Sequence, residues 1–233
     1  MPKNRLRKIY FGIFWAVLIA SFVVFATLLI FVANGYYFNL KTFKLQKTGM
    51  IVLRGSNGGI AIIVNGKKSQ NSFPIKLRRL IPGRYDIKIE KEGYQSWERV
   101  FQLEGGQAIV KNNINLFLTN PSIKEKSKNA DDILTLKNNY KERTKNITLK
   151  GSEIWVNNKL VTRYSQPILA AFLDPDEDHL YVQIGDLIRV IETEGTNDFV
   201  LIKLNGSLPT YFSVTSSKLT YLQDETIFEA TIR

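Results

Sequence analysis

Four residues that could do chemistry lie close together in the second half of the chain: Asp174, Asp176, Asp178 and His179. The three carboxylates, spaced two residues apart, match the first three ligand positions of a calcium-binding loop. The match then ends, because the sixth position is His179 instead of glycine and the twelfth is Gly185 instead of glutamate. We therefore expect a turn between two strands here, with a calcium site as the lesser alternative.

The supply of catalytic side chains is small. His179 is the only histidine, so no second imidazole can share a metal ion or a proton with it. The sequence has no nucleophile elbow, and Gly55 to Gly59 lacks the Gly-Lys-Ser ending of a phosphate-binding loop. The absence of cysteine excludes disulfides, thiolate zinc sites and thiol nucleophiles. We expect a non-catalytic protein without a cofactor or metal. The alternative is a membrane-tethered hydrolase or carbohydrate-active protein that uses the region from Asp174 to His179.

The element that assigns these residues to a compartment is an uncharged run of 25 residues from Ile9 to Ala33. As a helix it would be about 37 Å long, enough to cross a hydrocarbon core of about 30 Å. A buried core helix would show a polar stripe, and a signal peptide has an apolar region of only about 7–15 residues. We expect one transmembrane helix over residues 9–33. A cleaved signal peptide and a soluble helix are the weaker alternatives.

The orientation of this helix follows from the basic residues in front of it: Lys3, Arg5, Arg7 and Lys8. The positive-inside rule places such a flank in the cytoplasm, so residues 1–8 are expected as a cytoplasmic tail and residues 34–233 as extracytoplasmic. Residues 34–47 would form a stalk that begins with the rings of Tyr36, Tyr37 and Phe38 at the outer headgroup level. An exported chain without cysteine suits a bacterial or archaeal cell envelope.

The net charge of +11 is unevenly distributed. Residues 41–150 hold 22 basic and 9 acidic side chains, whereas residues 151–233 hold 6 basic and 12 acidic ones. Such asymmetry indicates separate domains that meet each other or an acidic partner. Membrane lipid and anionic cell-wall polymer are the acidic partners outside a cytoplasmic membrane, and a protein partner would suit the acidic part. Nucleic acid is not expected, because no recognition motif accompanies the basic residues. A merely solvated basic surface is the alternative.

Beyond the stalk the apolar residues recur with a period of two, which predicts strands. Six segments show it: Met50–Leu53, Ile60–Val64, Phe73–Leu77, Tyr85–Ile89, Trp97–Leu103 and Ile109–Leu118. The pair Asn65-Gly66 predicts a two-residue type I′ hairpin, because both residues tolerate positive φ. Residues 48–118, the sandwich segment, are expected to form a small antiparallel β-sandwich.

The turns of the sandwich segment resemble those of the PEGA domain. The resemblance rests on Gly58 to Gly66, Phe73 to Leu77, Leu80 to Tyr85, Lys91 to Tyr94 and Leu103 to Gly106. Its motif positions are Asn65, Gly66, Pro74, Pro82, Gly83, Tyr85, Gly93 and Tyr94. The sequence departs from the pattern at Ile60 and at residues 69–72. The resemblance implies a binding or spacer module of envelope proteins, with no catalytic residue.

Aromatic residues follow several of these turns. Tyr85, Tyr94 and Trp97 are expected to anchor turns or fill the core, since Tyr85 is in phase with Ile87 and Ile89. A stacking platform for a sugar is the alternative role of these three rings.

The chain after residue 118 changes character twice. Residues 119–146 are rich in Lys and Asn and are expected to be a linker or a loosely ordered connection, with room for a short helical turn or strand at Asp131 to Leu136. Residues 147–233 repeat a strand-turn-strand unit at Glu153–Val161, His179–Val190 and Lys218–Glu229, and the second and third units align at an offset of 39 residues. This period resembles β-propeller blades, but closure needs about four blades, so a partial propeller-like domain is expected. Its strand Thr226–Ile232 would be an open edge that favours self-association or capping by the sandwich.

The sequence thus predicts a mainly β protein with a single N-terminal transmembrane helix, a small antiparallel β-sandwich and blade-like hairpin repeats of an incomplete propeller. The function expected is that of a membrane-anchored extracytoplasmic binding or scaffolding protein of the bacterial cell envelope.

Overall fold

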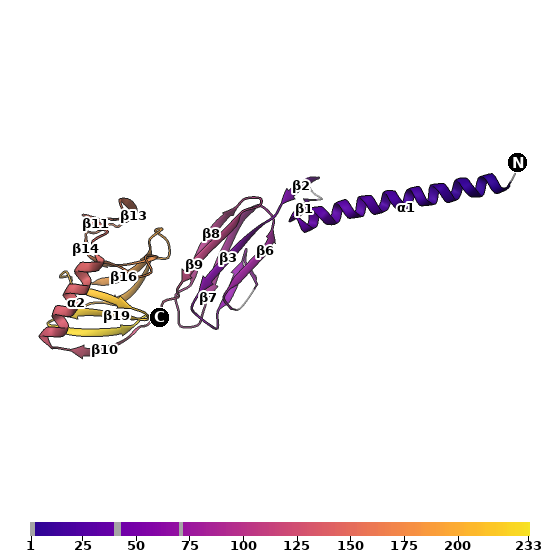
Figure 1. Cartoon of the computed structure of the whole chain (residues 1–233). Helices are drawn as coiled ribbons and strands as arrows, with labels where there is room; N and C mark the ends of the chain where they lie inside the picture. The colour runs from indigo at the N-terminus through magenta and orange to yellow at the C-terminus, as the bar shows by residue number, and fades with distance from the viewer. Residues whose placement is uncertain (1–2, 40–42, 70–71) are drawn as a thin grey trace. The chain divides into compact units, whose positions relative to one another are not determined.

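The computed structural model describes residues 3–39, 43–69 and 72–233 (Figure 1). It is mainly β, as expected, with helices α1 and α2 and strands β1 to β20 in these ranges. The chain divides into two compact units. The first is Met1–Val52, Ile75–Tyr85 and Phe101–Val110, and the second is Leu53–Pro74, Asp86–Val100 and Lys111–Arg233. The division passes through the strands of the sandwich segment, so Trp97 to Val100 belong to the same unit as the C-terminal sheets.

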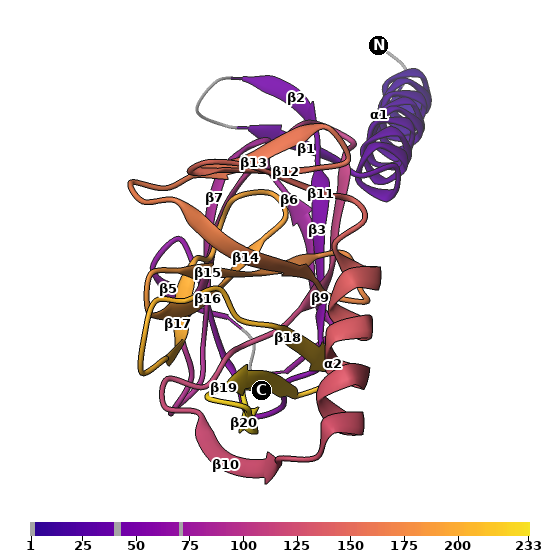
Figure 2. The ribbon, with the colours of Figure 1, turned by 90° about the vertical axis from the view of Figure 1, so that its left-hand side faces the viewer.

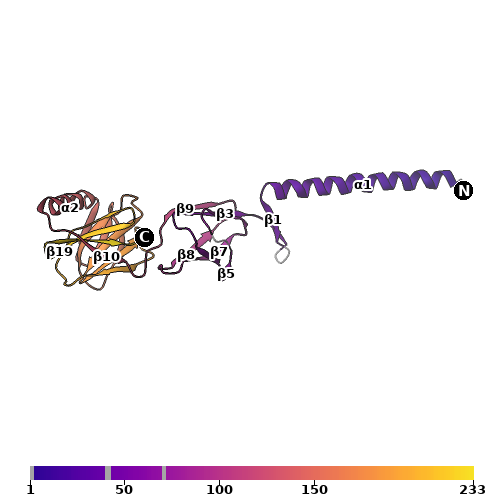
Figure 3. The same ribbon diagram turned by 90° about the horizontal axis from the view of Figure 1, so that it is seen from below.

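Helix α1 runs without a break over Lys3–Ala33 (Figure 3). Its stretch Tyr10–Ala33 is long and apolar enough to cross a membrane, and none of that stretch is buried inside the protein. Two residues after Ala33 terminate the helix: the side-chain amide of Asn34 donates to the Ile30 carbonyl at 2.8 Å, and Gly35 has a φ of 78°. Of the expected cytoplasmic tail, residues 1 and 2 lie outside the described residues. The basic flank forms the first turns of α1.

A short hairpin follows α1 in the region expected to be a stalk. Strands β1 (Tyr36–Asn39) and β2 (Lys44–Lys47) pair antiparallel, with Tyr36 opposite Lys47 and Phe38 opposite Leu45. Residues 40–42 of that expected stalk lie outside the described residues. Both the backbone amide and the hydroxyl of Thr48 donate to the Gly35 carbonyl at 2.8 Å, which ties the base of the hairpin to the end of the helix.

The sandwich segment contains two antiparallel sheets, as expected. Their strands are β3 (Gly49–Gly55), β4 (Ala61–Val64), β5 (Lys67–Lys68), β6 (Ile75–Leu80), β7 (Gly83–Glu90), β8 (Trp97–Leu103) and β9 (Ala108–Ile114). The strand orders are β6-β3-β9 and β5-β4-β7-β8. Strand β7 buries Ile87 and Ile89 and leaves Tyr85 half-buried on the same face, which confirms the period of two. The last strand ends at Ile114, four residues earlier than expected.

The C-terminal part consists of three antiparallel sheets and one helix. Two sheets follow chain order: β11-β12-β13 (Ile147–Lys150, Glu153–Val156, Lys159–Arg163) and β14-β15-β16-β17 (Ile168–Leu173, His179–Ile184, Leu187–Glu192, Phe199–Lys203). The third has the order β10-β20-β19-β18 (Ser122–Ser127, Thr226–Thr231, Lys218–Gln223, Phe212–Thr215). The three hairpins expected from the sequence are therefore present as β12–β13, β15–β16 and β19–β20.

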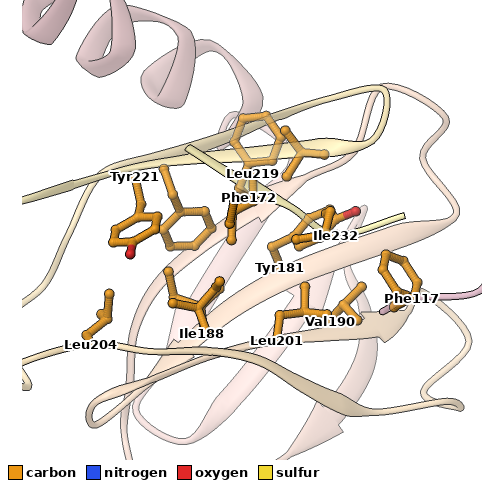
Figure 4. Packing of buried hydrophobic residues seen from close by; sticks show 14 of the residues in the cluster. Phe117, Phe172, Tyr181, Ile188, Val190, Leu201, Leu204, Leu219, Tyr221 and Ile232 are labelled. Atoms are coloured by element: carbon orange, nitrogen blue, oxygen red, sulfur yellow. The ribbon is translucent and has the colours of Figure 1, made fainter. Parts of the chain in front are cut away.

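The sheet β14–β17 is the centre of this part, because its strand β15 is buried along its whole length. Tyr181 belongs to the apolar cluster on one face, shared with β18, β19 and β20, whereas Leu180, Val182 and Ile184 belong to the cluster on the other face, shared with β12. Figure 4 shows the first cluster, in which Phe172 and Tyr181 meet Leu219 and Ile232. His179, Tyr181 and Gln183 alternate with Leu180, Val182 and Ile184 along β15. Their burial is possible because they form hydrogen bonds with Asp176, Asp174 and the Leu208 carbonyl, respectively.

Residues 119–146 are ordered, so the expectation of a linker was wrong for most of them. They contain β10 and the helix α2 (Ala130–Arg143), which lies beside β18 in Figure 2. The Asn129 side chain caps α2 by accepting from the Asp131 amide at 3.1 Å. Leu136 is buried, and the Tyr140 hydroxyl accepts from the Ala171 amide at 3.1 Å. A helix cap, one buried leucine and one hydroxyl hydrogen bond thus hold a segment whose composition is polar.

The strand order also corrects the expected open edge. Strand β20 lies between β10 and β19, so Thr226–Ile232 is an interior strand of its sheet. The partner that the sequence did not predict, β10, comes from 104 positions earlier in the chain, counted from Ser122 to Thr226. The β10 edge is charged, with Lys124, Glu125 and Lys126 exposed, a composition that discourages pairing between copies. The described sheets do not close into a propeller.

Candidate functional site

The acidic turn singled out in the sequence connects β14 to β15, as expected. The Asp174 amide donates to the His179 carbonyl at 2.9 Å, and Glu177 has a φ of 58°. The Asp176 side chain accepts from the Asp178 amide at 2.9 Å and lies 3.1 Å from the Nδ1 atom of His179. Burial alone would raise the pKa of Asp176, but the hydrogen bond with His179 lowers it overall.

Arg233 completes a buried cluster around this turn. Its guanidinium contacts the Asp174 carboxylate and donates to the Tyr181 hydroxyl at 2.6 Å. Tyr181 is fully buried, and Asp174 and His179 are only 4% and 2% exposed. Burial raises the pKa of Asp174, and the Arg233 guanidinium opposes that rise. The carboxylate of Asp174 is thus neutralised by a side chain that sequence reasoning did not single out.

The arrangement favours a structural role over metal binding. Asp174, Asp176 and His179 could together offer three ligand atoms within 4.8 Å of one another. However, Arg233 already supplies a positive charge at Asp174, and a metal ion there would have to displace it. Asp178, the third residue of the loop pattern, contacts Lys111 and Asn113 instead. The pattern in the sequence therefore splits into two separate groups of contacts.

A second polar network joins the sandwich strand β8 to the C-terminal strand β16. Trp97 is 1% exposed, and its indole N–H donates to the Oε1 atom of Glu192 at 2.8 Å. The other oxygen of Glu192 accepts from the Thr196 hydroxyl at 2.6 Å and the Asn197 amide at 3.1 Å. Burial would raise the pKa of Glu192, but these hydrogen bonds lower it overall. A buried Trp97 cannot offer its face to a sugar, which removes one ring of the alternative stacking platform.

Ion pairs extend this network, which we call the joint: Trp97, Arg99, Lys111, Asn113, Asp178, Glu192, Glu194 and Asn197. Arg99 contacts Glu194 and lies 3.7 Å from Glu192. The Lys111 ammonium lies 3.4 Å from Glu194, and the Asn113 amide donates to Asp178 at 2.5 Å. Two cations of the basic sandwich segment thus meet carboxylates of the acidic C-terminal part. This is one of the two outcomes expected from the charge asymmetry.

The residues of the PEGA motif lie at turns. Asn65 and Gly66 have φ values of 48° and 76° between β4 and β5, as a type I′ hairpin requires. The Tyr85 hydroxyl donates to the Ile81 carbonyl at 2.7 Å across the turn that contains Pro82 and Gly83. Gly93 has a φ of 78°, and Tyr94 lies under the Lys91 ammonium at 4.3 Å. The peptide bond before Pro74 is cis. Residues 70–71 of the departing tetrapeptide lie outside the described residues.

Strand β6 carries exposed cations on the outer side of its sheet. Lys76 and Arg78 are exposed and alternate with the buried Ile75 and Leu77. Because β6 is at the edge of the order β6-β3-β9, its cations can be reached from solvent. The side chains of the basic flank Lys3, Arg5, Arg7 and Lys8 are outside the described set, so only their place in α1 is known.

A groove runs between α2 and the turn from β19 to β20. It consists of two neighbouring hollows of about 670 and 420 Å³, both lined by Lys137, Leu222, Asp224 and Glu225. Its rim includes Leu134 and Leu208, which are 58% and 82% exposed. Sequence reasoning missed this groove because it requires α2, and the only signal was the weak apolar spacing of Ile133, Leu134 and Leu136.

Comparisons with known proteins agree with the fold of the sandwich segment. The PEGA domain family matches residues 48–120. A comparison with curated proteins found no match. A solved structure from Bacteroides fragilis, of a protein of unknown function for which membrane association has been suggested, aligns with 80% of this chain and 94% of its own chain. The two are 12% identical with a TM-score of 0.24, too low to support any argument. A segment similar to the PEGA domain family thus lies between an apolar N-terminal helix and a further β-rich part.

Proposed function

We propose that this protein is a non-catalytic, single-pass membrane protein of the bacterial cell envelope that holds a binding or scaffolding module outside the cytoplasm. The observation that carries the proposal is the unburied apolar stretch Tyr10–Ala33 followed by antiparallel sheets. Water is a poor solvent for such a helix, whereas the hydrocarbon core of a bilayer solvates its apolar side chains and is thin enough for the helix to cross. The PEGA match supports a binding or spacer role for residues 48–120.

The topology is tested by protease treatment of intact and lysed cells that produce the full chain. We expect residues beyond the helix to be cleaved on intact cells, while an N-terminal tag becomes accessible only after lysis. Extraction at alkaline pH should leave the protein in the membrane fraction. Protection of the β part on intact cells would overturn the proposed orientation.

The proposed ligand class is anionic. Strand β6 supports this, since Lys76 and Arg78 are exposed at a sheet edge. The double variant Lys76→Glu with Arg78→Glu should weaken binding of the full chain to anionic cell-wall material. Added salt should likewise weaken the binding of the parent protein to this material. The matched control is Lys124→Glu with Lys159→Glu, two exposed lysines outside the sandwich segment. An equal loss of binding in both double variants would show that only the net charge of the protein determines its binding.

The competing activity, hydrolysis at the acidic turn, is tested by His179→Asn and Asp176→Asn. The scaffold proposal expects no hydrolytic activity against ester, phosphoester and glycoside substrates in the parent protein. An activity that both substitutions abolish in folded protein would replace this proposal with the enzymatic one.

A further inference from the structure

We propose that the hairpin β1–β2 is a lipid-docking element that lies in the headgroup layer where α1 leaves the membrane. The inference rests on the membrane anchoring in the proposed function and adds a second contact with the same bilayer. Its source is the pairing register of the hairpin, which sorts the side chains of residues 36–38 and 43–47 onto two unlike faces.

One face of the hairpin is apolar. Opposed residues in an antiparallel pair share a face, and residues two apart along a strand share it too. The register Tyr36 with Lys47 and Phe38 with Leu45 therefore places Tyr36, Phe38 and Leu45 together, with Lys47 as the one charged residue of this face, at the end of the hairpin next to the helix. The ring of Phe43, two positions before Leu45, lies 6.3 Å from the ring of Phe38 in an edge-on contact, which extends the face.

The other face is more polar. Tyr37 is opposite Gln46 in the register, and Lys44 is two positions from Gln46 on the same strand. Tyr37, with its hydroxyl, is the one aromatic residue there among the described positions. The hairpin is therefore amphipathic with a period of two, and a shift of one residue reverses the character of the surface.

Much of the apolar face is exposed to solvent in the part of the hairpin that the structure describes. Phe38, Phe43 and Leu45 are 46%, 79% and 44% exposed. An isolated two-stranded hairpin is marginally stable in water, so this exposed face calls for a partner. Aromatic rings beside lysine side chains are the composition that membrane interfaces favour.

The partner we assign is the lipid surface through which α1 passes, because the hairpin is continuous with that helix. The Tyr36 ring contacts the ring of Phe31 in the last turns of α1, with centroids 5.6 Å apart. Thr48 donates twice to the Gly35 carbonyl, so both ends of the hairpin are held at the helix end. The apolar face therefore starts within one helical turn of residues that the membrane surrounds.

The chain has no native cysteine, so single labels can test the faces directly. Full-length Leu45→Cys and Lys44→Cys, each carrying a fluorophore, are reconstituted in nanodiscs that contain lipids with a quencher near the headgroup. These neighbours lie on opposite faces and are a matched pair. We expect at least about twofold stronger quenching at position 45 than at position 44, since only the apolar face enters the interface. Phe38→Cys and Tyr37→Cys should repeat the contrast.

A label at Val24→Cys, within α1, separates this inference from the proposed function. Quenching at position 24 with deep quenchers, together with equal or absent quenching at 44 and 45, would overturn lipid docking and leave the anchor intact. No quenching at position 24 would overturn both. Disulfide formation between copies of Leu45→Cys, with no quenching there, would assign the face to a second copy of this chain instead.

Discussion

Asp174 and Asp178 stand in one turn, yet each carboxylate is neutralised from a different part of the chain. Arg233 contacts Asp174, whereas Asn113 and Lys111 contact Asp178. Spacing in sequence therefore does not imply a shared role. Asp174 and Asp178, as well as Glu192 in the joint, stabilise the fold only as long as their distant partners are present.

The Asp174–Arg233 pair gives a prediction at this scale. Arg233→Leu leaves a buried carboxylate without its cation and should lower the free energy of unfolding by about 3 kcal/mol. Asp174→Asn in the Arg233→Leu background should recover part of that loss. Denaturant unfolding of the four proteins of this double-mutant cycle, in one detergent, measures the coupling. Strictly additive effects of the two substitutions would contradict the assigned pair.

Glu192 predicts a pH dependence. Its pKa in the folded protein is lowered from the ordinary value of 4.5 by hydrogen bonds that outweigh burial. Its contribution to stability is therefore complete above pH 4.5 and is lost as the pH falls further. Glu192→Gln should be less stable at neutral pH and lose less stability on acidification. Unfolding curves between neutral and acidic pH check this, and identical acid dependence of variant and parent would refute it.

Among the helices and strands, α2 is the one that the polar composition of its segment predicts least. Its buried residue Leu136 and its hydroxyl contact through Tyr140 attach it to the C-terminal sheets. The Tyr140 ring also makes edge-on contacts with Tyr211 and Phe212, at 5.4 and 5.7 Å. A helix of this length is marginal alone, so tertiary packing supplies its stability.

Two leucines of α2 form a matched test of that attachment. Leu136 is 4% exposed and Leu134 is 58% exposed. Leu136→Ala should cost about 3 kcal/mol because a buried side chain leaves a cavity, whereas Leu134→Ala should change stability by less than about 0.5 kcal/mol. Thermal unfolding of the full chain, with hydrogen exchange of residues 130–143, reports both. Similar effects of the two substitutions would mean that α2 is not packed as described.

In the molecule as a whole, basic side chains of the sandwich segment form ion pairs with acidic side chains of the C-terminal part. Arg99 and Lys111 of the basic segment contact Glu194 of the acidic part, while Trp97 donates to the buried Glu192. The cations of the joint are thereby occupied, and exposed cations such as those of β6 are the ones available to outside anions.

A charge exchange in the joint tests this ion pairing. Arg99→Glu places a third carboxylate beside Glu192 and Glu194 and should lower stability by roughly 3 kcal/mol. Adding Glu194→Arg should restore part of the lost stability, because the exchange recreates the ion pair between positions 99 and 194 but not the contact with Glu192. The control is Arg163→Glu, which breaks a solvent-screened pair with Glu153 and should lower stability far less than Arg99→Glu does. Limited proteolysis and unfolding curves compare the variants, and no rescue by the exchange would argue against the pairing.

The features that the sequence predicted correctly are local ones. The apolar run of α1, the period of two in β7 and the Asn65-Gly66 turn depend on residues within a few positions of one another. The same holds for the hairpins β12–β13, β15–β16 and β19–β20. The backbone preferences and face patterns of such segments can be read without knowing what they contact.

The tertiary structure alone decided what these segments pair with. In the structure β10 pairs with β20, and α2 packs beside β18. Arg233 contacts Asp174, Asn113 contacts Asp178, and the buried Trp97 donates to Glu192. Each of these contacts joins residues that are distant in sequence. Their stability comes from burial and charge pairing between side chains, and neither composition nor period records which partners come together.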